Sequence, residues 1–260
     1  MPVSRAEHEE SADTRWFPSE IVLVFALSLG ASGLRALVDL IGDLTSGQSL
    51  TSQVATLNAS RAPGRPWLDL SLQVLNLALA LVPVFLAAHF LARSGESLAT
   101  IGVDATRPKR DLLEGAVIAA VIGGAGLALY LGAHASGANL TVVPESLPAV
   151  WWRIPVLSFS ALQNALLEEV LVLGYLLHRL RQLGWSDNKA LATSATLRGS
   201  YHLYQGIGGF VGNAIMGLIF GRIFQRRGRV MPLLIAHTLM DAVAFIGYAE
   251  LAGRVSWIPT

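Results

Sequence analysis

Seven apolar runs, each near the length of a membrane span, limit the folds open to this 260-residue chain. A helix needs about 20 apolar residues to cross the hydrocarbon core of a bilayer. The runs lie at 19–42, 68–91, 112–135, 154–178, 189–204, 208–225 and 230–250, of which the fifth and sixth are short. Helices satisfy their own backbone hydrogen bonds in lipid. The pattern therefore predicts an all-α, polytopic membrane protein with about seven transmembrane helices.

The composition supports this class. Hydrophobic residues make up 53% of the chain and charged residues 14%, and the mean hydropathy is +0.52. Soluble domains carry roughly a quarter charged residues. A net charge of +1 gives no basis for nucleic-acid binding, and the absence of Cys excludes disulfides and Cys-based sites. The expected partner on these grounds is the lipid bilayer.

Lys and Arg are distributed unequally over the predicted loops. Twelve lie on the side of the N-terminus and four on the opposite side. Because cytoplasmic loops carry such an excess, we expect a cytoplasmic N-terminus, an external C-terminus and a location in the plasma membrane. Residues 1–17 form a polar tail without the basic start of a signal peptide, and residues 18–252 form a single membrane domain.

Ionisable residues inside the apolar runs are functional candidates, because each costs about 2.5–3.5 kcal/mol at the centre of a bilayer. Arg35 and Asp39 are four residues apart, and we expect them to form a structural ion pair near the outer interface. Six others gather in three runs of the C-terminal half: Glu168, Glu169, Arg198, His202, His237 and Asp241. This concentration favours a functional site over a hydrogen-bond network that only fastens helices.

The spacing of these six residues suggests how they converge. Arg198 and His202 are four residues apart on one predicted helix, and His237 and Asp241 are four apart on another. The two residues of each pair therefore share a helix face. Glu168 and Glu169 are adjacent, about 100° apart around an α-helix. Only one of them is therefore expected to point at a shared centre, and the other is expected to pair elsewhere, with Arg198 as the candidate.

Several intramembrane chemistries can be excluded. The chain has no His-Glu-x-x-His run for a zinc protease of that kind and no Gly-x-Ser-Gly-like nucleophile. An aspartyl protease needs Asp in two core spans, whereas the acidic pair here is glutamate. The remaining chemistry is a glutamate that works with histidines, either to activate water or to bind a metal.

Three motifs carry a resemblance to a known family. EEVLVLG at 168–174, RGSYH at 198–202 and HTLMD at 237–241 resemble the motifs of the CAAX protease and bacteriocin-processing (CPBP) family. The family pattern is Glu-Glu followed after three residues by Arg-Gly, then Phe-x-x-x-His, then His-x-x-x-Asn. The similarity covers about residues 110–250. It implies an intramembrane endopeptidase that acts on a peptide or membrane-protein substrate.

The resemblance also implies roles for particular residues. Glu168 is the expected general base and His202 the residue that helps to hold the attacking water. His237 and Asp241 occupy the positions that stabilise the developing oxyanion, and Glu169 is a supporting residue. A bound metal is not settled by the spacing, because Glu168, His202 and His237 could form a three-ligand site for a divalent ion such as zinc.

Three positions depart from the family pattern. Leu173 stands where the family has Arg, and Arg198 stands where it has Phe. We hypothesise that Arg198 supplies the positive charge missing at Leu173. Asp241 replaces Asn, and an ionised Asp would oppose an oxyanion unless an imidazolium pairs with it.

Depth poses a further question. His202 lies near the outer end of the fifth predicted span, whereas His237 lies nearer the inner end of the seventh. For their side chains to meet, the segment at 189–204 must tilt or re-enter, which the glycine-rich stretch after His202 would allow.

Two alternative functions stay open. One is a non-catalytic scaffold or immunity protein of the same family. The other is a small transporter with a Glu/His proton relay, which the lack of an evident inverted repeat disfavours. The catalytic hypothesis requires Glu168, His202 and His237 to lie within a few ångströms of one another.

Overall fold

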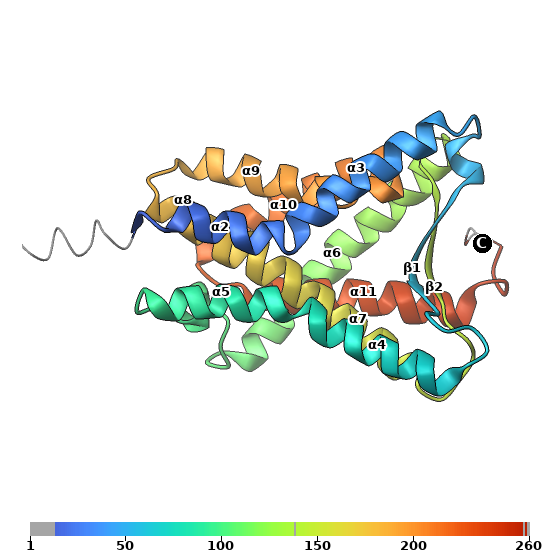
Figure 1. The fold of residues 1–260 in the computed structure, drawn as a ribbon, viewed down its shortest axis with the longest axis horizontal. Helices are drawn as coiled ribbons and strands as arrows, with labels where there is room; N and C mark the ends of the chain where they lie inside the picture. Colours follow the sequence, from blue (N-terminus) through green and yellow to red (C-terminus); the bar gives the residue numbers. More distant parts are fainter. Residues whose placement is uncertain (1–13, 138, 257, 259–260) are drawn as a thin grey trace, which may run out of the picture.

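The computed structural model describes residues 14–137, 139–256 and 258, so most of the predicted N-terminal tail lies outside the described residues. The helices run along one common direction, with the described N-terminal and C-terminal ends at opposite ends of the bundle (Figure 1). In chain order they are α2 (Phe17–Ala26), α3 (Leu29–Thr45), α4 (Pro66–Ala80), α5 (Val82–Arg93), α6 (Pro108–Ala135), α7 (Arg153–Ala165), η3 (Leu166–Tyr175), α8 (Leu176–Gln182), α9 (Asp187–Ser200), α10 (Ile207–Arg227) and α11 (Met231–Leu251). Short 3₁₀ turns occur at η1 (Leu50–Ser52), η2 (Leu98–Ile101) and η4 (Leu203–Gln205).

The prediction of an all-α polytopic membrane protein is confirmed. Within the described part of the chain, five helical stretches are long and apolar enough to cross a membrane: Pro66–Arg93, Pro108–Ala135, Arg153–Gln182, Ile207–Arg227 and Met231–Leu251. The pair α2 and α3, bent by 49°, makes a sixth if it is counted as one span. The structure thus has five or six spans where the sequence predicted about seven.

The difference arises at 189–204. This run forms α9, whose 14 residues extend about 21 Å and fall short of a bilayer core of about 30 Å. The chain then turns through η4 and Gly206, which has a positive φ of 94°, and returns along α9 as α10. The segment therefore runs partway through the bundle and turns back, which answers the question of depth raised by the sequence.

A small sheet closes the end of the bundle opposite the N-terminus. Strand β1 (Val54–Ala59) follows α3, and β2 (Thr141–Ser146) follows α6. The two strands are parallel, with Val54 opposite Thr141 and Ala59 opposite Ser146. The segment between α3 and α4 thus contains a strand that connects the first helices to the segment that follows α6.

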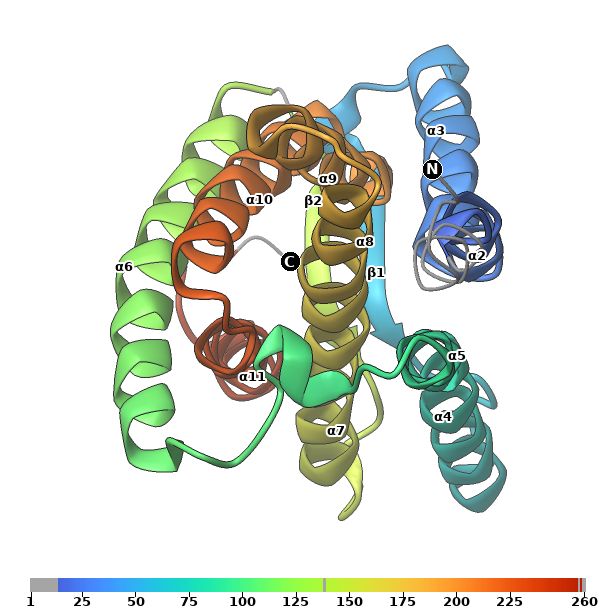
Figure 2. The same cartoon turned by 90° about the vertical axis from the view of Figure 1, so that its left-hand side faces the viewer.

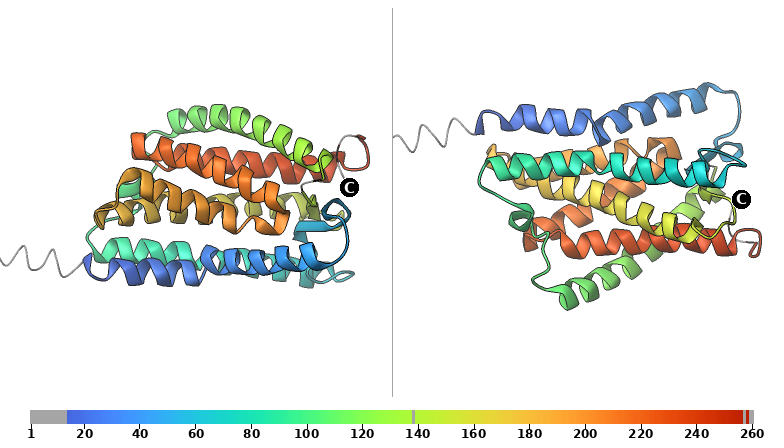
Figure 3. Two further views of the ribbon diagram at one scale, coloured as in Figure 1. Left: turned by 90° about the horizontal axis from the view of Figure 1, so that it is seen from above. Right: turned by 60° about the horizontal axis from the view of Figure 1, so that its bottom comes forward.

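The helix α7–η3–α8 runs through the middle of the bundle. Figure 2 shows it between α2–α5 on one side and α6, α10 and α11 on the other, and Figure 3 shows the same layering. Every residue from Glu168 to Tyr175 is buried. In contrast, α6 buries only two of its 28 residues and presents apolar side chains outward, as expected of a lipid-facing helix. The centre of the molecule is therefore built on η3.

Arg35 and Asp39 do not form the expected ion pair. Both side chains are exposed on α3, and among the described residues no contact within 4.0 Å joins them. An exposed pair gains little Coulomb energy and loses side-chain entropy when its geometry is fixed. No neighbouring helix holds the two side chains together on this outer face.

Candidate active site

The segment LLEEVLVLGY, η3, is a π-helix of ten residues. A π-helix closes its hydrogen bonds between residues i and i+5 and is frequent at functional sites. It has more residues per turn than an α-helix, so adjacent side chains are separated by less than 100°. As a result, carboxylate oxygens of both Glu168 and Glu169 and a ring nitrogen of His237 lie within 4.8 Å of one another. The expectation that the two glutamates could not face one centre is wrong.

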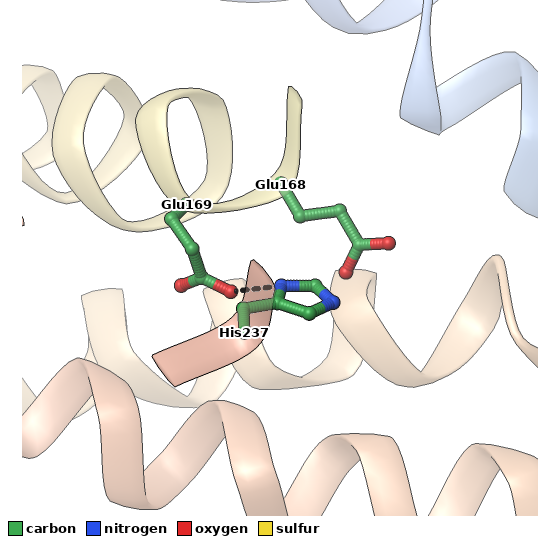
Figure 4. A group of neighbouring side chains, drawn as sticks. All are labelled: Glu168, Glu169 and His237. Atoms are coloured by element: carbon green, nitrogen blue, oxygen red, sulfur yellow. Dashed lines mark hydrogen bonds and ion pairs between the residues drawn. The ribbon is translucent and has the colours of Figure 1, made fainter. Parts of the chain in front are cut away.

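The inner part of the site is a buried trio. Arg198 Nη2 donates to Glu169 Oε1 at 2.6 Å, which confirms the predicted pairing, and His237 Nδ1 lies 2.7 Å from the same oxygen. Glu169 and Arg198 are completely buried. Since an ionised carboxylate only accepts hydrogen bonds, we assign the proton to His237 Nδ1. The Nε2 atom of His237 then faces away from Glu169, toward Glu168 (Figure 4).

Glu168 lies on the more open side of this trio. Tyr201 Oη donates to its Oε2 atom at 2.9 Å, and Arg198 Nη2 lies 3.3 Å from the same atom. Its other oxygen, Oε1, lies 3.9 Å from His202 Nε2. His202 Nδ1 is 2.9 Å from the carbonyl oxygen of Arg198 and therefore carries a proton, which leaves the Nε2 lone pair directed toward Glu168.

Asp241 completes the cluster at one edge. Its Oδ1 atom is 3.6 Å from His237 Nε2, one helical turn away on α11. The side-chain amide of Asn164 on α7 donates to Asp241 Oδ2 at 3.0 Å. An amide nitrogen thus lies next to the position where the CPBP pattern has Asn.

All six candidate residues are brought together by α7–η3, α9 and α11. The catalytic hypothesis required Glu168, His202 and His237 to lie within a few ångströms of one another. Glu168 meets this condition with both histidines, since it lies 3.9 Å from His202 and within 4.8 Å of His237. The sequence analysis missed Tyr201 and Asn164. A signal existed for both, since Tyr201 adjoins His202 and Asn164 precedes Glu168 by four residues.

The packing is consistent with the hypothesis that Arg198 supplies the positive charge that is missing at Leu173. A Cβ atom on Gly217 would lie 3.2 Å from Arg198 Cδ and 3.0 Å from Ala195 Cα, so glycine at this position lets α9 and the Arg198 side chain pack closely against α10. One turn further along α10, Gly221 faces Leu173. The two side chains therefore pack on neighbouring turns of the same helix.

Several polar atoms of the site have no partner in the protein. In the part of the chain that the structure describes, Glu169 Oε2, Arg198 Nε and Arg198 Nη1 are buried and form no hydrogen bond. Buried polar groups in native proteins are usually paired, and unpaired ones often mark functional sites. Three such atoms occur on the adjacent residues Glu169 and Arg198, so unpaired polar groups are concentrated at this site.

Comparison with known proteins identifies a family. Residues 150–243 match the model described as type II CAAX prenyl endopeptidase Rce1-like. This part of the chain is similar to that family. The search of curated proteins and the search of solved structures each give no match.

The Rce1-like segment contains all six candidate residues, together with Tyr201 and Asn164. It begins just before α7 and ends within α11, so the matched residues include η3, α9 and α10. The similarity to type II CAAX prenyl endopeptidases is therefore located in the segment that carries the cluster. The preceding helices and the β1–β2 sheet lie outside the Rce1-like match.

The residues of the site meet some requirements of a metal site and not others. Glu168, His202 and His237 offer one oxygen and two nitrogens, a donor set that zinc accepts. The charge distribution is less suitable, because Arg198 Nη2 lies 3.3 Å from Glu168 and opposes a nearby dication. Glu169 is engaged with Arg198 and His237 and would support the ligand His237 rather than bind the ion itself.

Proposed function

We propose that this protein hydrolyses a peptide bond within the membrane and that Glu168 is the general base. One observation carries this proposal: Glu168 Oε1 and the free Nε2 of His202 face each other at 3.9 Å. That distance is too long for a direct hydrogen bond. It allows one water molecule to donate to both atoms through hydrogen bonds of about 2.8 Å that meet near a right angle. The water oxygen then keeps its lone pairs for attack.

The proton balance of the reaction follows from this arrangement. As the water oxygen bonds to the scissile carbonyl carbon, Glu168 takes one of its protons. The tetrahedral intermediate then collapses, the carbon–nitrogen bond breaks, and Glu168 returns the proton to the leaving amine. Glu168 ends the cycle ionised, with one water consumed and two peptide ends released.

His237 and Asn164 are the proposed stabilisers of the oxyanion. Carboxylates of Glu169 and Asp241 flank His237, and in the doubly protonated form of the ring Nε2–H can donate to the oxyanion. Asp241 acts as a positioning residue, since it accepts one hydrogen bond from the Asn164 amide and leaves the second amide hydrogen free. The acid at Asp241 is then compatible with an oxyanion nearby.

Glu169 and Arg198 are proposed positioning residues. Glu169 fixes the His237 ring through Nδ1, and Arg198 neutralises Glu169. Without Arg198, two adjacent buried carboxylates would lie side by side with no guanidinium between them, and their repulsion would disturb the position that Glu168 needs as a base.

The reaction is proposed to proceed without a metal, because Arg198 already supplies a positive charge beside Glu168. A divalent ion, if bound, would be held by Glu168, His202 and His237 and would polarise the substrate carbonyl. We expect treatment with a chelator, followed by its removal, to leave the cleavage rate within about twofold. Loss of activity that zinc alone restores would assign a metal to the site.

Cleavage of a peptide library by the purified protein tests the function. Wild type, Glu168→Gln, His202→Ala and the matched control Glu250→Gln, an exposed glutamate near the end of α11, are compared in detergent or liposomes. We expect a 10²–10⁴-fold loss, approximately, in both active-site variants and no change in the control. Absence of cleavage by the wild type on every peptide would contradict the proposal and favour a non-catalytic scaffold.

We further propose that the N-terminal end of the bundle is cytoplasmic and that the protein resides in the plasma membrane. The excess of Lys and Arg at that end supports this orientation. Since the chain has no Cys, single cysteines report topology without background. In intact cells, a membrane-impermeant maleimide should label Arg65→Cys near β1, and should label Lys109→Cys only after permeabilisation. The reverse pattern would overturn the orientation.

A further inference from the structure

A second polar region adjoins the proposed catalytic centre, and of its residues only Asn164 has a role in the reaction described above. It is a cavity of about 180 Å³ bounded by β1, α4, α7 and η4. One buried water needs only about 15 Å³ by the same kind of measure, so the cavity has room for a larger ligand. Its polar lining is unusual for a position between two helices of membrane-spanning length.

The cavity reaches the active site through two of its lining residues. Asn164 lies in the wall and donates to Asp241 at 3.0 Å. The ring of Tyr204, also in the wall, is stacked near His202, with centroids 6.3 Å apart and planes inclined by 22°. A molecule that fills the cavity would therefore lie directly beside the atoms proposed to perform hydrolysis.

Carboxamides dominate the polar lining. Asn58 and Gln73 are used within the protein, since each donates to a backbone carbonyl at 2.9 Å. Asn76 and the buried Gln163 differ, because among the described residues their side chains form no hydrogen bond with the protein. A carboxamide both donates and accepts hydrogen bonds, which matches the alternating N–H and C=O groups of a peptide backbone.

Strand β1 adds a second element suited to a peptide. Leu57, Asn58 and Ala59 line the cavity, and β2 is the one strand that pairs with β1 in the described part of the chain. The other edge of β1 can accept an extended segment by strand addition, in which main-chain hydrogen bonds give affinity.

Arg61, an exposed residue, gives the cavity a positive charge. It follows β1 and is the one charged residue among those lining the cavity. Its guanidinium forms no ion pair or hydrogen bond within the described residues. Asn164, by contrast, lies 11 residues into α7 from Arg153, about 17 Å along that helix. The cavity thus has a cationic group near the sheet and the catalytic centre beside its deep wall.

We propose that this cavity is a substrate subsite that binds an extended peptide segment carrying a carboxylate. The segment lies along β1, its backbone bonds to Asn76 and Gln163, and its carboxylate pairs with Arg61. The carboxylate is either the free C-terminus of the substrate or an Asp or Glu side chain. This inference rests on the proposed peptidase function and adds the substrate class and the direction from which it enters.

Matched peptides test the inference on the full-length protein. A cleaved peptide is prepared with a free C-terminus or a C-terminal carboxamide, and with Glu or Gln near that end. For wild type, the carboxylate-bearing forms should have a lower KM. Arg61→Gln should raise that KM roughly tenfold to hundredfold, as expected for loss of a charge-assisted hydrogen bond, with kcat within twofold. Arg61→Lys should retain most of the preference.

Two further variants keep the test specific. Arg65→Gln, an exposed arginine of the same loop that does not line the cavity, should behave as wild type. Gln163→Leu, which preserves the approximate size of the side chain, should raise KM for every peptide regardless of charge. If Arg61→Gln and Gln163→Leu leave all KM values unchanged in an active enzyme, the subsite is wrong while the peptidase function stands.

A binding measurement separates the subsite from the peptidase function if the wild type shows no activity. If the wild type cleaves nothing, anisotropy of the same labelled peptides measures affinity directly. Carboxylate-dependent binding that Arg61→Gln weakens would retain the subsite and reject the peptidase. Binding that is independent of both the carboxylate and Arg61 would reject the subsite.

Discussion

Two buried arginines near the central helix have very different surroundings. Arg179, on α8, donates to Glu96, Gln182, the Phe90 carbonyl and Ser94 at 2.7–2.9 Å. Only its Nε atom is unpaired. Arg198, at the active site, uses Nη2 alone, and its Nε and Nη1 atoms are unpaired together with Glu169 Oε2. Both side chains are fully buried.

The difference separates a network that fastens helices from the one to which we assign a catalytic role. The Arg179 network holds the turn after α5 against α8 and leaves little polar capacity for any other molecule. The Arg198 network tolerates unsatisfied groups beside a cavity, which costs stability and has to be offset elsewhere. The two guanidinium groups have the same charge and are equally buried, so the number of hydrogen bonds that each one forms is the informative difference.

The strongest test of this comparison is Arg198→Leu. It leaves Glu169 buried without a counter-charge, so we expect a loss of about 3–5 kcal/mol in the free energy of unfolding, together with loss of activity. Denaturant unfolding in detergent measures the first effect. Adding Glu169→Gln should recover much of the stability, whereas the half-buried Arg222→Leu on α10 should change it little. Normal stability and activity of Arg198→Leu would reject the proposed compensation for Leu173.

Arg179→Gln is the matching change at the other network. The loss of charge-assisted hydrogen bonds to Glu96 should reduce the free energy of unfolding by about 1.5–3 kcal/mol. Because Arg179 lies away from the cluster around Glu168, kcat of the remaining folded protein should not change. A selective fall in kcat at normal stability would show that the Arg179 network also takes part in the reaction.

The smallest expected effect concerns Glu96. Burial raises the pKa of this carboxyl, but the hydrogen bond with His178 and the charges of His178 and Arg179 lower it further, so that it lies below the usual 4.5. A lowered folded-state pKa adds stability above pH 4.5 that is lost as the pH falls below it. Melting temperatures should therefore drop at acidic pH, with a weaker dependence in Glu96→Gln than in Glu250→Gln. Identical curves would contradict this assignment.

Much of the architecture could be predicted because its cause is local. A run of apolar residues determines a membrane helix by length alone, and charged residues inside such a run are visible in the sequence. This is why the cluster around Glu168, His202 and His237 could be named in advance, and why Arg198 could be matched with Glu169.

The remaining features depend on geometry that no single run contains. The angle between Glu168 and Glu169 was misjudged because an α-helical period was assumed for η3. The ion pair of Arg35 and Asp39 was expected from their spacing, but spacing does not fix two exposed side chains. Asn164 was overlooked because its importance comes from Asp241, 77 residues later.

The π-helical segment also sets how the long central helix presents its two ends. An α-helix turns by about 100° per residue, and η3 turns by less over each of its ten residues. The side chains of α8 therefore point in directions that differ from those that a continuous α-helix starting at α7 would give them. One continuous helix can thus direct Asn164 toward the cavity beside β1 and Arg179 toward the turn after α5, so η3 changes the direction of the side chains that follow it as well as carrying the two glutamates.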